Sequence, residues 1–224
     1  MKEPLKIIAE RGLIPRIILN EDGLYMGDLK HYFRIVITKA RNLTKPYHNF
    51  RHMFYVVCTC FEACRYYLKK SGQHSIKIRS LLIAAMFHDF DHSGVVGHDD
   101  LEIERAIRGL RKHILPEDLG EFDAIATLIR YTEYPYKMKA DELSMEGQIL
   151  RDADLSQALS GVWMQQILFG LSQEMNLTPL EMLRTQEAFL NGLKFNTLWA
   201  QEKFSPEVVQ SKIAEVKGLL EIME

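Results

Sequence analysis

The run Ala84-Ala85-Met86-Phe87-His88-Asp89-Phe90-Asp91-His92 decides the fold and contains the first candidate ligands. Its apolar start predicts a buried helix, whereas an imidazole and carboxylates at its end are costly to bury unless a metal or hydrogen bonds compensate them. On a continuous helix, His88 and His92 would project from one face, because residues four apart are neighbours there. Asp89 would then approach the same metal from the side. A lone His-Asp pair is more often two helix-terminal residues with ordinary hydrogen bonds.

Two further segments of the sequence offer the same kinds of side chain. Pro46-Tyr47-His48-Asn49-Phe50-Arg51-His52 places a second histidine pair, four residues apart, at the expected start of another helix, behind a proline that favours helix starts. Leu150-Arg151-Asp152-Ala153-Asp154-Leu155-Ser156 supplies two acids between apolar residues. Imidazole together with carboxylate suits divalent ions such as Zn, Mn, Fe or Mg. The three segments therefore predict a metal centre assembled from separate parts of the chain.

The order of these residues resembles the signature of a known superfamily. His52, then His88-Asp89, then Asp154 follow the H…HD…D order of the HD-superfamily metal-dependent phosphohydrolases. Three longer motifs are similar, in the same order, to those of the class I 3′,5′-cyclic nucleotide phosphodiesterases: Tyr47-His48-Asn49-x-x-His52, His88-Asp89-x-Asp91-His92-x-Gly94 and Ala153-Asp154-Leu155-Ser156. The resemblance covers roughly residues 30–210, and the motifs are specific in combination.

The ligand types and the resemblance imply the same division of roles. The metal ligands of a first divalent ion would be His52, His88, Asp89 and Asp154. Asp89 would bridge to a second, largely water-coordinated ion, and two ions about 3.5–4 Å apart can share a water, lower its pKa and deliver hydroxide to phosphorus. His48 would protonate the departing ribose oxygen as general acid. His92 would assist by binding phosphate or the waters of the second ion.

Three further carboxylates are candidates for positions behind the ligands. Asp91 and Asp152 could orient histidine rings, because metal-bound imidazoles usually donate their other N–H to a carboxylate or carbonyl; a capping or solvent-facing role is equally open for both. The family's Glu-Asn-His-His segment is absent between Ile103 and His113, and Glu104 could supply the carboxylate that the family places near the bridging water. A solvated helix face is the alternative for Glu104.

Gln186-Glu187-Ala188-Phe189 stands where the family carries its Gln-x-x-Phe. The resemblance implies that the Gln186 amide hydrogen-bonds a purine edge and that Phe189 stacks on the purine face. Residues three apart share a helix face, and an amide offers both donors and an acceptor, so both side chains could reach one ligand. The alternative is an amphipathic helix with a solvent-facing glutamine and a core phenylalanine. The sequence does not choose between adenine and guanine.

The spacing of apolar residues is helical almost throughout. It predicts an all-α fold, a compact multi-helix domain of the HD/phosphodiesterase type with its metal site between helices. Two stripes should face the core, one formed by Ile103, Ala106, Ile107, Leu110 and Ile114 and the other by Phe122, Ile125, Ala126 and Ile129. Thr178-Pro179-Leu180-Glu181 predicts a capping box at a helix start, and Ser205-Pro206 predicts the start of the last helix.

Length and composition favour one domain. With 224 residues, 47% of them hydrophobic, the chain can bury one substantial core, so a single catalytic domain is expected over residues 1–224. The net charge of −2, with acids and bases interspersed, predicts no nucleic-acid partner. The run from Leu81 to Phe87 is far shorter than the roughly 20 residues of a membrane span, so no membrane association is expected.

Two smaller features concern assembly and location. The strip Val209, Ile213, Val216 and Leu220 could pair with another subunit, which leaves a homodimer open, although such a strip is more often docked on its own domain. Cys58, Cys60 and Cys64 lack the spacing of paired metal-binding cysteines, so core packing is expected. Their odd number, and the lack of a secretory signal in the first twenty residues, predict a reducing, cytoplasmic location.

Three functions compete on this sequence. The first is hydrolysis of a small-molecule nucleotide, a 3′,5′-cyclic nucleotide, to the 5′-monophosphate, which uses two divalent ions together with His48 and the Gln186/Phe189 pair. The second is a general HD phosphohydrolase acting on nucleotide monophosphates or other phosphoesters, which needs the metals but neither of those features. The third is a metal-retaining binding domain without turnover, disfavoured because every ligand candidate is present.

Overall fold

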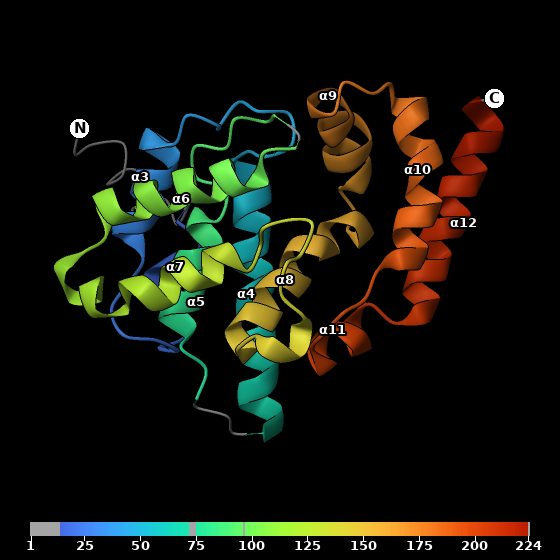
Figure 1. Ribbon diagram of the computed structural model, residues 1–224. Helices are drawn as coiled ribbons and strands as arrows, with labels where there is room; N and C mark the ends of the chain where they lie inside the picture. Colours follow the sequence, from blue (N-terminus) through green and yellow to red (C-terminus); the bar gives the residue numbers. More distant parts are fainter. Residues whose placement is uncertain (1–13, 72–74, 96, 224) are drawn as a thin grey trace.

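The structure, a computed structural model, describes residues 14–71, 75–95 and 97–223. Helices and connecting loops make up this part of the chain, which contains no strand (Figure 1). The predicted all-α fold is confirmed. The expectation of no secretory signal concerns a segment of which residues 1–13 lie outside the described residues.

The helices follow one another with short connections. Their order along the chain is α2 (Arg16–Leu19), α3 (Lys30–Lys39), α4 (Phe50–Ser71), α5 (Ile78–Phe87), α6 (Asp99–His113), η1 (Pro116–Glu121), α7 (Phe122–Arg130), η2 (Ala140–Glu142), α8 (Met145–Leu155), η3 (Ser156–Leu159), η4 (Met164–Leu171), α9 (Ser172–Glu174), α10 (Pro179–Gly192), α11 (Leu198–Lys203) and α12 (Pro206–Met223). The segment η4 is a π-helix, whereas η1, η2 and η3 are 3₁₀ turns.

Helix α5 lies at the centre of the main core. Nearly all of its residues are buried, because an apolar run without a polar face can only be covered on all sides. Helices α3, α4, α6, α7 and α8 pack around it. The predicted core stripes of α6 and α7 are confirmed, except that α6 ends at His113, so the half-buried Ile114 lies one residue beyond the helix.

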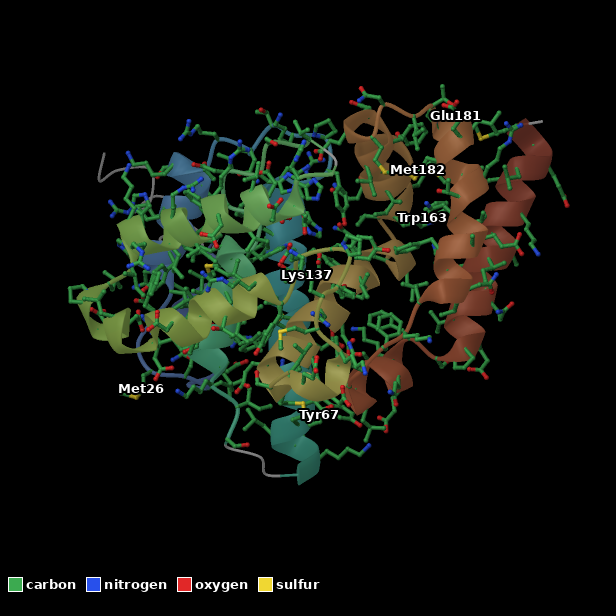
Figure 2. All side chains as sticks on the ribbon, viewed as in Figure 1. Met26, Tyr67, Lys137, Trp163, Glu181 and Met182 are labelled. Atoms are coloured by element: carbon green, nitrogen blue, oxygen red, sulfur yellow. The ribbon has the colours of Figure 1, made fainter. Side chains whose placement is uncertain are left out.

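A second, smaller apolar cluster joins the later helices. It is formed by Tyr47, Ala158, Trp163, Ile167, Leu168, Met182, Leu183, Leu190, Ile213 and Val216. Figure 2 shows Trp163 and Met182 between η4 and α10. Helix α12 packs on α10, so Ile213 and Val216 of the predicted strip are buried against their own chain.

Local sequence signals account for several helix boundaries. The capping box is confirmed: Thr178 Oγ1 accepts from Glu181 N at 3.2 Å, and Thr178 N donates to Glu181 Oε2 at 2.7 Å. Helix α12 starts at Pro206 as predicted. The expectation for α5 was wrong in one respect. This helix ends at Phe87, so His88 and His92 do not share a helix face; His88 follows the last turn and His92 lies beyond a loop in which Asp91 has a φ of 65°.

The cysteines take part in packing, as the sequence predicts. Cys60 and Cys64 are buried in the main core, Cys58 is half-buried, and all three are free thiols. Burial raises the pKa of Cys64 to about 12 and that of Cys58 to about 11. These thiols are therefore protonated and poor metal ligands at neutral pH.

Candidate metal centre and active site

Four side chains converge where α4 begins and where α5 and α8 end. His52 comes from the first turn of α4, His88 and Asp89 follow α5, and Asp154 comes from the last turn of α8. His52 Nε2 lies 3.3 Å from Asp89 Oδ2 and 3.1 Å from Asp154 Oδ1. His88 Nε2 lies 3.2 Å from Asp89 Oδ2 and 3.9 Å from Asp154 Oδ1. We call these residues the four-donor cluster.

The outer hydrogen bonds of the two imidazoles fix their ring orientation. His52 Nδ1 lies 2.7 Å from Gln157 Oε1, and His88 Nδ1 lies 2.8 Å from the carbonyl oxygen of Ala85. Both oxygens only accept, so each Nδ1 carries the proton and donates it. Each Nε2 is therefore directed into the cluster, and the two Nε2 atoms lie 3.2 Å apart. Metal-bound imidazoles are typically held in this way.

The electrostatics of the four-donor cluster favour a bound cation. Asp89 Oδ2 is buried, and no protein donor in the described part of the chain reaches it with hydrogen-bond geometry. Burial alone would lower the pKa of His52, but Asp154 and Asp89 raise it to about 10. In the metal-free protein a proton on His52 therefore takes the place that a cation would take. The donor set of two imidazoles and two carboxylates fits a borderline divalent ion.

A second group of possible ligands shares Asp89. Ligand atoms of His48, Asp89 and His92 lie within 4.8 Å of one another. The rings of His48 and His92 stack with their centroids 3.6 Å apart. His92 Nδ1 accepts from Gly94 N at 2.9 Å, and burial lowers the pKa of His92 to about 4, so this ring is neutral. Asp89 thus lies between two groups of donors.

His48 has a carboxylate partner that sequence reasoning missed. Its Nδ1 lies 2.5 Å from Glu174 Oε2, and Glu174 Oε1 also accepts from the backbone N–H groups of Tyr47 and His48. Helix α4 starts at Phe50 behind Asn49, whose Oδ1 accepts from Arg51 N, so His48 lies just before the helix rather than in it. Burial would raise the pKa of Glu174, but its bonds to His48 lower it, so this carboxylate is ionised.

The buried carboxylate on α6 is Glu102, not Glu104. Glu104 is half exposed on the outer face and pairs with Arg130, so the expectation for Glu104 was wrong. Glu102 is 4% exposed and accepts from Ser93 N and Ser93 Oγ. Burial would raise the pKa of Glu102, but the bonds from Ser93 lower it. Because Ala106 is four residues after Glu102, the predicted apolar stripe already placed position 102 on the buried face.

Asp91 and Asp152 bind backbone rather than histidine rings. Asp91 Oδ1 accepts from Arg41 N at 2.8 Å and ties the loop after α5 to the segment before His48. Asp152 is fully buried and accepts from the backbone and side chains of Asn196 and Thr197, where α11 begins. Asp152 therefore takes the capping alternative, at the start of α11, whereas Asp91 joins two loops.

Gln186 and Phe189 lie on α10, beside the second apolar cluster. Gln186 is buried, and its amide donates to Met182 and Thr185 of its own helix. Phe189 is 37% exposed. Through Met182 the glutamine borders the cluster that also contains Tyr47, the neighbour of His48.

Comparison with known proteins agrees with this geometry. Residues 47–99 match the family model described as 3′5′-cyclic nucleotide phosphodiesterase. The segment contains two of the three motifs, with His48, His52, His88, Asp89 and His92. Over this segment, which is less than half of the chain, the match confirms the resemblance to the class I cyclic nucleotide phosphodiesterases drawn from the motifs, and the HD superfamily is consistent with it. Neither the curated proteins nor the solved structures include a match to it.

One further property concerns membranes. Within residues 14–71, 75–95 and 97–223, none of the helices combines the length and hydropathy that crossing a membrane requires.

Proposed function

We propose that this chain is a metal-dependent phosphodiesterase that hydrolyses a 3′,5′-cyclic nucleotide to its 5′-monophosphate. The observation that carries the proposal is the position of His48. Its ring is held by the buried carboxylate of Glu174 and lies within ligand distance of Asp89, the residue shared by both donor groups. A phosphodiesterase with an alkoxide leaving group needs such a proton donor beside the metals. A general phosphohydrolase needs only the metal ligands.

The residues divide the work as follows. The four-donor cluster would hold one divalent ion, and Asp89, together with water, would hold a second one. Bound there, divalent ions would polarise the phosphoryl group and acidify a water. Because Nδ1 of His48 is engaged by Glu174, Nε2 is the atom that can pass a proton to the ribose oxygen as the phosphorus–oxygen bond breaks. His92, neutral and stacked on His48, limits the movement of that ring.

The purine contact and the domain extent belong to the same proposal. Gln186 would turn its amide from Met182 towards the base, and Phe189 would cover the base. Residues 1–224 would form one catalytic domain, since Glu174 lies in α9, between the η4 and α10 helices of the second apolar cluster, while the metal donors lie at the ends of helices of the main core. The three free cysteines agree with a reducing, cytoplasmic location.

The leaving group provides the test. A cyclic nucleotide expels an alkoxide that needs a proton, whereas bis(p-nitrophenyl) phosphate expels a stable phenolate that does not. We expect His48→Ala to lower kcat for the cyclic nucleotide by roughly 10²–10⁴-fold and to spare the aryl ester. Metal content of each variant is the control. Equal losses on both substrates, or no loss on either, would favour the general phosphohydrolase.

A further inference from the structure

A cavity is lined by Gln157, the residue that holds the outer nitrogen of His52. Its volume is about 520 Å³, within the roughly 300–1,000 Å³ range of small-molecule sites. Gln157 lines this cavity and also accepts the proton of His52 Nδ1, whereas the metal donors converge on Nε2 of the same ring. The two nitrogens point in different directions from the imidazole. None of the metal donors, and neither His48 nor Gln186, is among the residues that line the cavity, so it is distinct from the candidate active site.

The walls of the cavity come from three elements. Helix α4 contributes Arg51 and Tyr55, and Gln157 comes from η3. Val162, just before η4, is 44% exposed, and Phe169 within η4 is 47% exposed. Apolar side chains of this size exposed beside a cavity offer a surface on which a flat ring can lie.

The polar groups indicate what kind of ligand would fit. Arg51 is exposed and is the charged group of the lining, which contains no carboxylate in the described residues. Gln165 and Gln166 add two amides, which can pair with a ring edge that carries both donors and acceptors. Gln166 is 3% exposed, and its Oε1 is buried without a hydrogen-bond partner within the described parts of the chain. A buried amide oxygen left unpaired is costly, so a ligand N–H there would be favourable.

We propose that this cavity is a second, non-catalytic site for a small organic anion with a flat, hydrogen-bonding ring, of the size of a nucleoside monophosphate. Arg51 binds the anionic group, Phe169 and Val162 cover the ring, and Gln166 accepts from an N–H at the ring edge, such as the exocyclic amino group of an adenine. Because Gln157 belongs both to the wall and to the hydrogen bond of His52, an occupant would lie directly behind a metal ligand. The proposal concerns binding alone and does not depend on turnover.

The test is calorimetric titration of the chain of residues 1–224, treated with a chelator, with adenosine 5′-monophosphate as the probe. We expect saturable binding that weakens by roughly tenfold or more in Arg51→Gln, which removes a charge-assisted contact. Gln166→Leu should weaken it by a similar factor, and inorganic phosphate alone should bind at least about tenfold more weakly than the nucleotide. Arg65→Gln, an exposed arginine of the same helix outside the cavity, should bind like the wild-type chain.

Several outcomes would overturn the proposal. Absence of binding at millimolar probe would do so, as would equal affinities of Arg51→Gln and Arg65→Gln. Binding lost in His48→Ala and retained in Arg51→Gln would place the probe in the candidate active site instead. Phosphate binding as tightly as the nucleotide would refute the contacts to the ring. Thermal melting of each variant shows that the fold is retained.

Discussion

Glu174 and Gln157 orient the two histidines of the first motif in the same manner. Each accepts a hydrogen bond from Nδ1, of His48 and His52 respectively, so that Nε2 of both rings is left for chemistry. The difference lies in charge, because the carboxylate of Glu174 adds a negative charge that stabilises a protonated ring, whereas the amide of Gln157 adds none. A proton donor beside a metal ligand requires that contrast.

Glu174→Gln should therefore reduce kcat by roughly 10–100-fold, the usual cost of removing a group that orients an active-site histidine, with little change in KM. The measurement is steady-state kinetics on a cyclic nucleotide across a range of pH. Glu187→Gln is the matched control, since Glu187 lies on α10 and pairs with Lys217 at the surface. A kcat of Glu174→Gln equal to that of the unchanged chain would contradict this role and show that the Glu174 carboxylate only supports the fold.

The pair Glu102 and Glu104 allows a comparison within one helix. Glu102→Gln weakens the bonds to Ser93 and Arg105 beside His92 and should lower the free energy of unfolding by about 1–3 kcal/mol. Glu104→Gln loses an exposed ion pair and should change it by less than about 0.5 kcal/mol. Urea unfolding of the two variants measures both values. Equal changes in the free energy of unfolding would mean that the buried hydrogen bonds of Glu102 do not stabilise the fold more than the exposed ion pair of Glu104 does.

At the scale of single residues, the sequence predicts site residues that stand together in short motifs. It does not predict hydrogen-bond partners that are distant in sequence. The four-donor residues stand in three short motifs, and the structure brings them together. Glu174 could not be found this way, because it lies 126 positions from His48 in a segment without another acidic residue nearby. Glu102 could have been found, since the apolar stripe of α6 includes its position.

Among the elements, the π-helix η4 determines the position of Glu174, because α9, which contains Glu174, follows it directly. Gly170 in this π-helix lies against the backbone before His48: a Cβ there would stand 2.6 Å from the carbonyl oxygen of Pro46. Backbone cannot yield as a flexible side chain can. Only glycine lets η4 come this close to the loop that carries His48.

Gly170→Ala should lower the free energy of unfolding by about 1–3 kcal/mol through overpacking, and should also lower kcat by displacing Glu174 from His48. Denaturant unfolding and kinetics at a temperature where the variant is folded separate the two effects. Gly192→Ala, at the end of α10 with open space around its Cβ, should leave both quantities nearly unchanged. A stable, fully active Gly170→Ala would refute this account of η4.

The elements themselves were predicted better than their ends. The stripes of α6 and α7 and the capping box of α10 follow from spacing and are confirmed. The end of α5 was misplaced because His88 and His92 suit a helix equally well by spacing. In the structure the His88 ring is hydrogen-bonded to the carbonyl of Ala85, and the His92 ring to the N–H of Gly94. The spacing of apolar residues does not predict such hydrogen bonds.

Over the whole molecule, the candidate site lies where two apolar clusters meet. The main core, built around α5, positions the metal donors, and the second cluster carries Tyr47 and the helices that lead to Glu174 (Figure 1). Buried carboxylates and imidazoles at such a junction are costly without a cation. Metal binding should therefore stabilise the fold.

The pH dependence of metal binding follows from His52. Its pKa of about 10 in the metal-free chain means that a proton must leave when a metal binds, so apparent metal affinity should rise with pH, by up to about tenfold per unit for each proton displaced. The stability of the metal-free chain depends on pH in the opposite direction. The folded pKa lies above the unfolded value of about 6.5, so the contribution of His52 is complete below that pH and is lost as pH rises towards 10.

Calorimetric metal titrations in buffers of different ionisation enthalpy measure the protons released, and thermal melts with and without chelator measure the stabilisation. Metal affinity that stays constant between about pH 6 and pH 8 would contradict the assignment of His52 as a ligand.

The central claim is most directly tested by ³¹P NMR of cyclic AMP and cyclic GMP incubated with the purified chain, with Mn, Mg and Zn added in turn. We predict that the cyclic phosphodiester signal of at least one nucleotide is replaced by that of its 5′-monophosphate, and that Asp89→Ala shows no conversion. Cyclic nucleotides left intact under every metal, while nucleotide monophosphates or an aryl diester are cleaved, would contradict the phosphodiesterase account and leave a general phosphohydrolase.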